Sequence, residues 1–459
     1  YRKIIDAVMN AADFVGTELK PAAGFGVGSP IRHLDGRAKV RGHLRFGADG
    51  IPEGALAVRV IRSPHHLAHF TMGDRERFVA SHIGIEAVID ATDIPGRNCF
   101  GVIPPFADQP VFAEKVARFR GEAVAAVIGD ADVLASLPDD ALPITWQIQA
   151  AALTPGAAQR STTEPVHEAR EDNVLTRGFV QRGEVVTALE QAAFLAEVST
   201  STPFIEHAYV EPEAGYAIRQ GNRITVFGST QAAQMDRDAL ADIMALPVEQ
   251  IRIVPSACGG GFGSKLDLSF QPFIALAAWM TGRPAVICYS RSESMRSTTK
   301  RHPSDITLAV GCDQNGQITA FDFHGVFNTG AYASWGPTVA NRVPVHASGP
   351  YFIPHYRARS VAVHTNTVPA GAFRGFGVPQ SAVAQECAFD ELADKVGIDR
   401  LQFRLNNALR NGQPTVTGQV FEKGVGIAEC LAALRPAWER AIARSKAYNS
   451  EHQNANFRK

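Results

Sequence analysis

Two spacings of hydrophobic residues alternate along the chain and predict its strands and helices. Apolar residues at every second position, or in short continuous runs rich in β-branched residues, predict strands at residues 55–63, 122–130, 144–150, 223–230, 250–257 and 360–366. Apolar residues three and four positions apart predict helices at residues 4–15, 131–137, 234–246, 270–280 and 381–397. The stretch 305–325 alternates on both sides of Asn315 and Gly316, which predicts a hairpin.

This mixture of elements predicts an α/β or α+β protein with more than one domain, and α+β is the class we expect. Polar stretches and stretches rich in Gly and Pro mark the candidate boundaries. They divide the chain into an N-terminal helix and linker (1–29), a small α/β domain (30–155), a linker (156–190) and a larger α+β domain (191–459). A chain of 459 residues is long enough to bury two or three cores.

Composition narrows the class of partners. The formal net charge is −1, so electrostatics favour neither nucleic acid nor an anionic membrane surface. No apolar run reaches the roughly 18 residues that a membrane span requires. The six cysteines lie far apart without a CxxC pair, which argues against an iron–sulfur or zinc site within this chain. Sparse cysteines and no visible signal peptide predict a cytoplasmic protein.

A glycine-rich loop, CGGGFGSK at residues 258–265, is the first candidate site. Ser264 separates Gly263 from Lys265, so the loop fails the phosphate-binding pattern in which Gly-Lys is contiguous. Ser264 also replaces the last glycine of the dinucleotide fingerprint. Phe262 cannot bind phosphate, but it can exclude water from a reactive centre. A tight turn with a core aromatic residue is the alternative interpretation.

A second loop of the same style, GAFRGFG at residues 371–377, adds Arg374. At this point the sequence resembles the molybdenum hydroxylases, the xanthine dehydrogenase/aldehyde oxidoreductase family. Three motifs carry the resemblance: GSTQ (228–231), GGGFGSK (259–265) and AFRGFG (372–377). Their spacings, 31 residues from Gln231 to Phe262 and 112 from Phe262 to Arg374, also resemble those of the family.

The resemblance implies a fold for each domain. Residues 30–50, PIRHLDGRAKVRGHLRFGADG, resemble the start of the family's small α/β hammerhead domain. Domain 191–459 then corresponds to the N-terminal half of the molybdopterin-binding domain.

The resemblance also implies roles for individual residues of the site. Gln231, Phe262 and Arg374 are expected around the molybdenum, with Gln231 bonded to its apical oxo ligand, and Gly261 and Gly263 against the cofactor. Arg342, Leu266 and Phe376 are expected to contact substrate. Purine-oxidising relatives carry glutamate where this chain has Leu266, so the resemblance favours an aldehyde or an aromatic N-heterocycle over a purine.

The expected catalytic glutamate base is absent from this sequence, which contains no matching GxGE segment. The resemblance places that base on a C-terminal half carried by another chain, because this chain stops near the middle of the family's subunit. It further implies molybdenum–molybdopterin, with cytosine dinucleotide as the expected form, and partner chains that carry [2Fe–2S] clusters and FAD. The chain is therefore expected to be a split subunit or a fragment that cannot turn over alone.

Several alternatives remain open. A scaffold subunit without metal, or a subunit of a xanthine dehydrogenase, could share the same fold. His65 and His69 in HHLAH could bind a metal from one helix face, although surface histidines are favoured because no third ligand is evident. The carboxylates at Glu206, Glu211 and Glu213 are interpreted as structural rather than catalytic.

Overall fold

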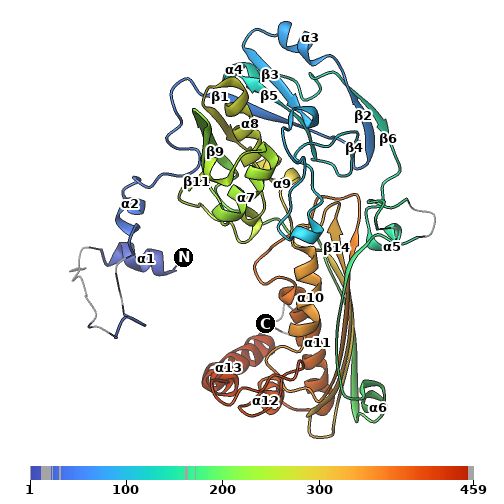
Figure 1. Ribbon diagram of the computed structural model, residues 1–459. Helices are drawn as coiled ribbons and strands as arrows, with labels where there is room; N and C mark the ends of the chain where they lie inside the picture. Colours follow the sequence, from blue (N-terminus) through green and yellow to red (C-terminus); the bar gives the residue numbers. More distant parts are fainter. Residues whose placement is uncertain are drawn as a thin grey trace.

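The computed structural model describes residues 2–11, 22, 24–29, 31, 33–160, 164–170 and 172–452. An upper lobe holds a seven-stranded and a three-stranded sheet, and a lower lobe is built on long strands flanked by helices (Figure 1). The short helices α1 (Arg2–Met9) and α2 (Gly36–Val40) lie to one side of both lobes (Figure 1). None of the described helices combines the length and the apolar character needed to cross a bilayer.

The seven-stranded sheet of the upper lobe has the strand order β11-β10-β9-β12-β1-β5-β3. Its strands are β1 (Leu56–Arg62), β3 (Ile85–Asp90), β5 (Ala123–Gly129), β9 (Ala214–Gln220), β10 (Arg223–Gly228), β11 (Ile251–Pro255) and β12 (Ala285–Cys288). Helices α7 (Ala233–Met244) and α8 (Gln271–Thr281) pack on it. Helix α8 is buried from Gln271 to Ala278, as its apolar sequence predicts.

Smaller elements complete the upper lobe. A three-stranded sheet has the order β4-β2-β6. Its strands are β2 (Ala68–Met72), β4 (Val116–Ala117) and β6 (Ile144–Ile148). The short helices are α3 (Arg75–Ala80), α4 (Ala131–Ser136), α9 (Arg291–Ser297) and the 3-10 turns Ala91–Asp93, Pro104–Phe106, Val248–Gln250 and Ser264–Leu266.

The lower lobe is a five-stranded sheet with the order β7-β15-β14-β13-β8. Its strands are β7 (Val174–Arg182), β8 (Phe194–Thr202), β13 (Ser304–Cys312), β14 (Ile318–Gly330) and β15 (His355–His364). Helices α10 (Gly336–His346) and α11 (Val378–Val396) pack along it, and α12 (Arg400–Asn407) and α13 (Ile427–Glu451) lie near its lower end (Figure 1). The remaining helices are α5 (Pro155–Ala158) and α6 (Val185–Glu190).

The α+β class is confirmed, and the predicted hairpin forms as β13 and β14 around Gly316, whose φ is +75°. The predicted linker at 156–190 is wrong over its second half. Residues Val174–Arg182 form β7, an edge strand that pairs antiparallel to β15, and α6 follows it. An edge strand with one exposed face tolerates the polar residues that suggested a linker.

Two further expectations need adjustment. The small α/β domain keeps the three-stranded sheet to itself, but its strands β1, β3 and β5 join strands of the larger domain in the seven-stranded sheet, where β1 pairs parallel to β12 through Leu56 and Ala285. The predicted helix at 4–15 is described only as α1, and its residues 12–15 lie outside the described residues. Ile5, Val8 and Met9 of α1 are exposed.

Candidate functional site

The glycine loop after β11 is shaped by close contacts that only glycine allows. A Cβ at Gly261 would lie 2.4 Å from Oε1 of Gln231. A Cβ at Gly263, where φ is +112°, would lie 2.6 Å from the carbonyl oxygen of Ala372. Glycine at these two positions therefore lets the loop touch both the Gln231 turn and the 371–377 loop.

Gln231 is held in one amide orientation by this loop. The Gly263 N–H donates to Oε1 of Gln231 at 3.0 Å, and the Gln231 N–H donates to the Lys265 carbonyl at 2.8 Å. Because Oε1 accepts, the carboxamide Nε2 is the atom that faces away from the loop. Within the described part of the chain, Nε2 donates to no protein atom, and the residue is exposed. Gln231 thus offers an uncharged, unused hydrogen-bond donor.

Phe262 and Arg374 lie on the two loops where these loops join. The Arg374 N–H donates to the Phe262 carbonyl at 2.9 Å. Phe262 adopts a positive φ of +51° and leaves 47% of its surface exposed. The Arg374 side chain is exposed and makes no ion pair with any described residue. The junction of the two loops therefore brings together the residues Phe262, Arg374 and Gln231.

Lys265 does not point toward this junction as a phosphate-binding lysine would. Its Nζ lies 3.0 Å from both the carbonyl and Oε2 of Glu211, and 4.7 Å from the ring centre of Tyr209. Glu211 also accepts from the N–H groups of Gly259 and Gly47. Lys265 is buried, so its charge serves to anchor the loop from behind. The contact between Lys265 and Glu211 therefore gives this lysine a structural role, unlike the lysine of a nucleotide-binding loop.

The 371–377 loop rests on a stack of buried side chains. Phe373 stacks on His207 with ring centres 4.0 Å apart, and the Arg301 guanidinium covers it at 3.9 Å. The His207 Nε2 bonds to the Ala372 carbonyl at 2.8 Å, and Arg301 donates to the Arg374 carbonyl at 3.0 Å. Burial lowers the pKa of His207 to about 4, so this imidazole is neutral at neutral pH.

The residues expected to contact substrate are only partly brought together. The Arg342 guanidinium lies 5.5 Å from the ring centre of Phe376, and Trp335 meets this ring edge-on at 5.7 Å. A groove of about 530 Å³ runs beside Arg342 along α10. Its lining residues are Ile103, Phe106, Pro337, Thr338, Asn341, Arg342, Val345 and His346. Leu266 lies half-buried at the end of the glycine loop and does not line this groove.

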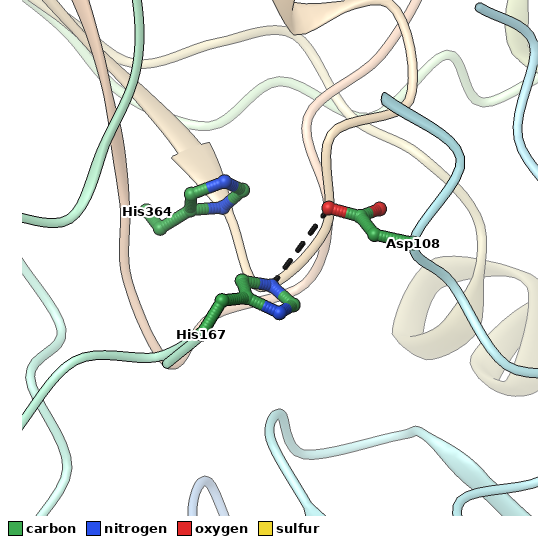
Figure 2. Close-up of side chains that lie close together, drawn as sticks. All are labelled: Asp108, His167 and His364. Carbon is green, nitrogen blue, oxygen red and sulfur yellow. Dashed lines mark ion pairs between the residues drawn. The ribbon is translucent and has the colours of Figure 1, made fainter. Parts of the chain in front are cut away.

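A second cluster joins Asp108, His167 and His364, whose potential ligand atoms lie within 4.8 Å of one another (Figure 2). Sequence reasoning missed it because the three residues are far apart in the chain and share no motif. Nη1 of Arg170 lies 2.8 Å from both Asp108 Oδ2 and His364 Nε2. This guanidinium provides the positive charge that a metal ion would otherwise bring, so the cluster as it stands is an internal ion pair.

The remaining sequence candidates are structural. His65 and His69 do not share a helix face, because the chain is irregular at His65 and enters β2 at Ala68. The Glu206 carboxylate pairs with Lys300 at 2.6 Å. The Glu213 carboxylate accepts a hydrogen bond from the Tyr209 hydroxyl.

Comparisons of the sequence with known proteins agree on one family of molybdopterin-binding proteins. Residues 166–408 match the molybdopterin cofactor-binding domain family. The chain is 36% identical over 411 residues to the "Nicotinate dehydrogenase large molybdopterin subunit" of Eubacterium barkeri, covering 89% of this chain and 95% of that protein. It is 37% identical over 374 residues to a protein of Bacillus subtilis (strain 168) described as a probable xanthine dehydrogenase subunit, covering 81% of this chain and 50% of that protein.

The fold agrees with these relatives. The aldehyde oxidoreductase from Desulfovibrio gigas superposes with a TM-score of 0.89 at 25% identity, over 96% of this chain and 50% of that one. The chain thus spans about half the length of this protein and of the Bacillus relative. It belongs to the molybdopterin cofactor-binding family, within the xanthine dehydrogenase/aldehyde oxidoreductase group of molybdenum hydroxylases.

Proposed function

We propose that this chain is the molybdopterin-binding subunit of a hydroxylase that oxidises an aldehyde or an aromatic N-heterocycle, with water as the oxygen source. The free amide Nε2 of Gln231, oriented by the Gly263 N–H beside the exposed Phe262 ring, is the observation that carries the proposal. When bound, the molybdenum–molybdopterin group supplies the two-electron oxidation chemistry.

The residues present fit this cofactor. Gln231 would donate a hydrogen bond to the bound group without adding charge, and Phe262 would exclude water from it. Gly261 and Gly263 keep the loop in close contact with Gln231 and Ala372, since a Cβ at either position would clash with these residues, and the loop backbone is proposed to lie against the cofactor. Arg374 places an unpaired positive charge beside the same junction. These roles are the ones that the family resemblance implies, and the geometry of the site supports them.

The positive charge in the groove beside Arg342 favours a substrate that is anionic, and the Phe376 ring favours one that is flat. Arg342 and His346 are its ionisable lining residues, and no acidic side chain is among them. Phe376 offers a ring face against which an aromatic substrate can pack. The Eubacterium relative is described as acting on nicotinate, a ring with a carboxylate. We therefore propose nicotinate as the first substrate to test, and an aromatic aldehyde as the second.

We further propose that the enzyme is completed by other chains. These are a second molybdopterin-binding chain with the glutamate base, a [2Fe–2S] chain or domain, and an FAD chain. The open junction of Gln231, Phe262 and Arg374 supports a partner that covers it. Cytosine dinucleotide is the proposed form of the pterin. The six free cysteines support a reducing, cytoplasmic setting.

The test is to purify the chain with the proteins that accompany it in the cell and to measure molybdenum by mass spectrometry. We expect one molybdenum per copy, and dye reduction with nicotinate or benzaldehyde. Products formed in H₂¹⁸O are expected to carry the label. Gln231→Ala is expected to lower kcat by about 100-fold, as removal of one preorganised donor does.

Three outcomes would contradict the proposal or a part of it. An assembly without molybdenum favours a scaffold subunit. An assembly with molybdenum that oxidises xanthine but neither nicotinate nor benzaldehyde favours a purine enzyme. Turnover by this chain alone would refute the need for a partner.

A further inference from the structure

Asp267 is a buried carboxyl that none of the roles above uses. It directly follows the glycine loop, only 8% of its surface is exposed, and no cation among the described residues pairs with it. Burial raises the pKa of Asp267 to about 7. A buried carboxyl without a cation is costly unless hydrogen bonds compensate it, so its contacts indicate what it does.

A hydrogen bond connects this carboxyl to the substrate side of the site. The Ser334 hydroxyl donates to Oδ2 of Asp267. Ser334 adopts a positive φ of +41°, which a non-glycine residue keeps only when its surroundings hold it. A Cβ at Gly371 would lie 2.4 Å from the Ser334 Oγ, so the 371–377 loop sits directly on this side chain. Asp267 therefore lies where the glycine loop, the Ser334 turn and the 371–377 loop meet.

The residues that follow Ser334 in the chain connect it to the Phe376 ring. Trp335 follows Ser334, stands at the N-terminus of α10 and meets the Phe376 ring at 5.7 Å and 83°. Arg342, further along α10, lies over the same ring. Phe376 itself has a positive φ of +46°. Its ring is thus held by Trp335 and Arg342, and the start of α10 is held by Asp267 through Ser334.

We propose that Asp267 is a positioning residue that fixes Ser334, Trp335 and the start of α10, and thereby the Phe376 ring on which the substrate packs. The part that concerns substrate rests on the proposed function. The hydrogen bond, rather than a negative charge, does the positioning, because no cation among the described residues pairs with the carboxyl. A shift of about 1 Å in a substrate-positioning group is sufficient to change substrate binding strongly.

The experiment compares Asp267→Ala, Asp267→Asn and Ser334→Ala in the protein purified with its accompanying chains. Hydrogen exchange is followed by mass spectrometry in peptides that cover residues 332–338 and 371–378, and KM and kcat are measured with nicotinate and benzaldehyde. For Asp267→Ala and Ser334→Ala we expect at least fivefold faster exchange in both segments. We also expect a KM raised about 10-fold and kcat changed less than about threefold.

Asp267→Asn keeps an oxygen and a hydrogen-bonding amide at this position. We therefore expect its exchange rates, its KM and its kcat to remain within twofold of the wild-type values. The matched control is Asp236→Ala, which removes another buried carboxyl, one that bonds Gln271 and not Ser334. It is expected to leave exchange in the two segments unchanged.

The proposal is overturned if Asp267→Ala exchanges like the wild type, if Asp267→Asn behaves like Asp267→Ala, or if Asp236→Ala gives the same changes. The exchange measurement needs no substrate, so it decides the positioning role even if the wild type oxidises neither probe. In that case the proposed function fails and the positioning of Phe376 is judged by exchange alone.

Discussion

At Gly261 the absence of a side chain decides where Gln231 can lie. For Gly261→Ala, the added Cβ would lie 2.4 Å from Oε1 of Gln231, so the carboxamide must move. We expect kcat of the assembled enzyme to fall by about 100-fold, because a catalytic donor displaced by about 1 Å loses most of its effect. Gly426→Ala is the control, since a Cβ there meets nothing within 4 Å. Equal kcat values for the two variants would contradict the proposed role of Gln231.

His302 makes stability depend on pH in a calculable direction. It is buried beside Arg301, and burial lowers its pKa to about 3. The unfolded histidine binds a proton below about pH 6.5, whereas the folded one does not. Its contribution to stability is therefore complete above about pH 6.5 and is lost as the pH falls from there toward 3.

His302→Gln removes this contribution. Between about pH 6 and pH 4, the free energy of unfolding of the wild type should fall more steeply than that of the variant, by about 1.4 kcal/mol per pH unit. Urea titrations at several pH values measure the difference, in which contributions from other groups cancel. Parallel curves would show that the histidine is not kept neutral in the folded state.

At the scale of elements, the packing of α8 on the seven-stranded sheet depends on glycines that face Phe270. A Cβ at Gly215 of β9 would lie 2.4 Å from Cε2 of Phe270, and one at Gly228 of β10 would lie 2.6 Å from its Cζ. Phe270 is buried just before α8 begins. The ring can therefore approach the sheet only where two strands lack side chains.

Gly215→Ala is expected to destabilise the protein by about 1–3 kcal/mol, as overpacking of a full core does. Urea unfolding measures the effect. Gly156→Ala, where a Cβ meets no atom within 4 Å, is the control and should change the stability by less than about 0.5 kcal/mol. If both variants unfold alike, the helix and sheet are not tightly packed there.

At the scale of the molecule, the Arg170 cluster ties three distant segments together. Asp108 lies in the small domain, Arg170 lies in the expected linker and His364 ends β15. Asp108 also accepts from the Ala333 N–H at 2.9 Å. Asp108 and Arg170 are partly buried, and removal of one partner from such a hydrogen-bonded pair costs about 1–3 kcal/mol, so we expect a loss of this size in the free energy of unfolding for Arg170→Ala, measured by urea titration.

The same variant tests whether this cluster binds a metal. With Arg170 removed, two imidazoles and a carboxylate could bind zinc. Micromolar Zn²⁺ is therefore expected to raise the Tm of Arg170→Ala and to leave that of the wild type unchanged. Stabilisation of the wild type by zinc would show that the cluster is a metal site after all.

Much of the fold could be predicted from local patterns. The strands at 223–230 and 250–257, the hairpin at 305–325 and the buried helix at 270–280 all form. Their signals are local: periodicity, a turn dipeptide and a run of apolar residues. The predicted linker at 156–190 failed over β7, because an edge strand with one polar face resembles a loop in sequence.

The sequence by itself determined the order of motifs around Gln231, Phe262 and Arg374, because each motif is a short contiguous run that needs particular residue types. Only the tertiary structure decided which atom of Gln231 is free, that Lys265 serves Glu211, and that Arg170 lies among Asp108, His167 and His364. These contacts join residues that are far apart in the chain. Their geometry depends on how distant segments pack within a lobe or, for the Arg170 cluster, between the two lobes, which no local pattern encodes.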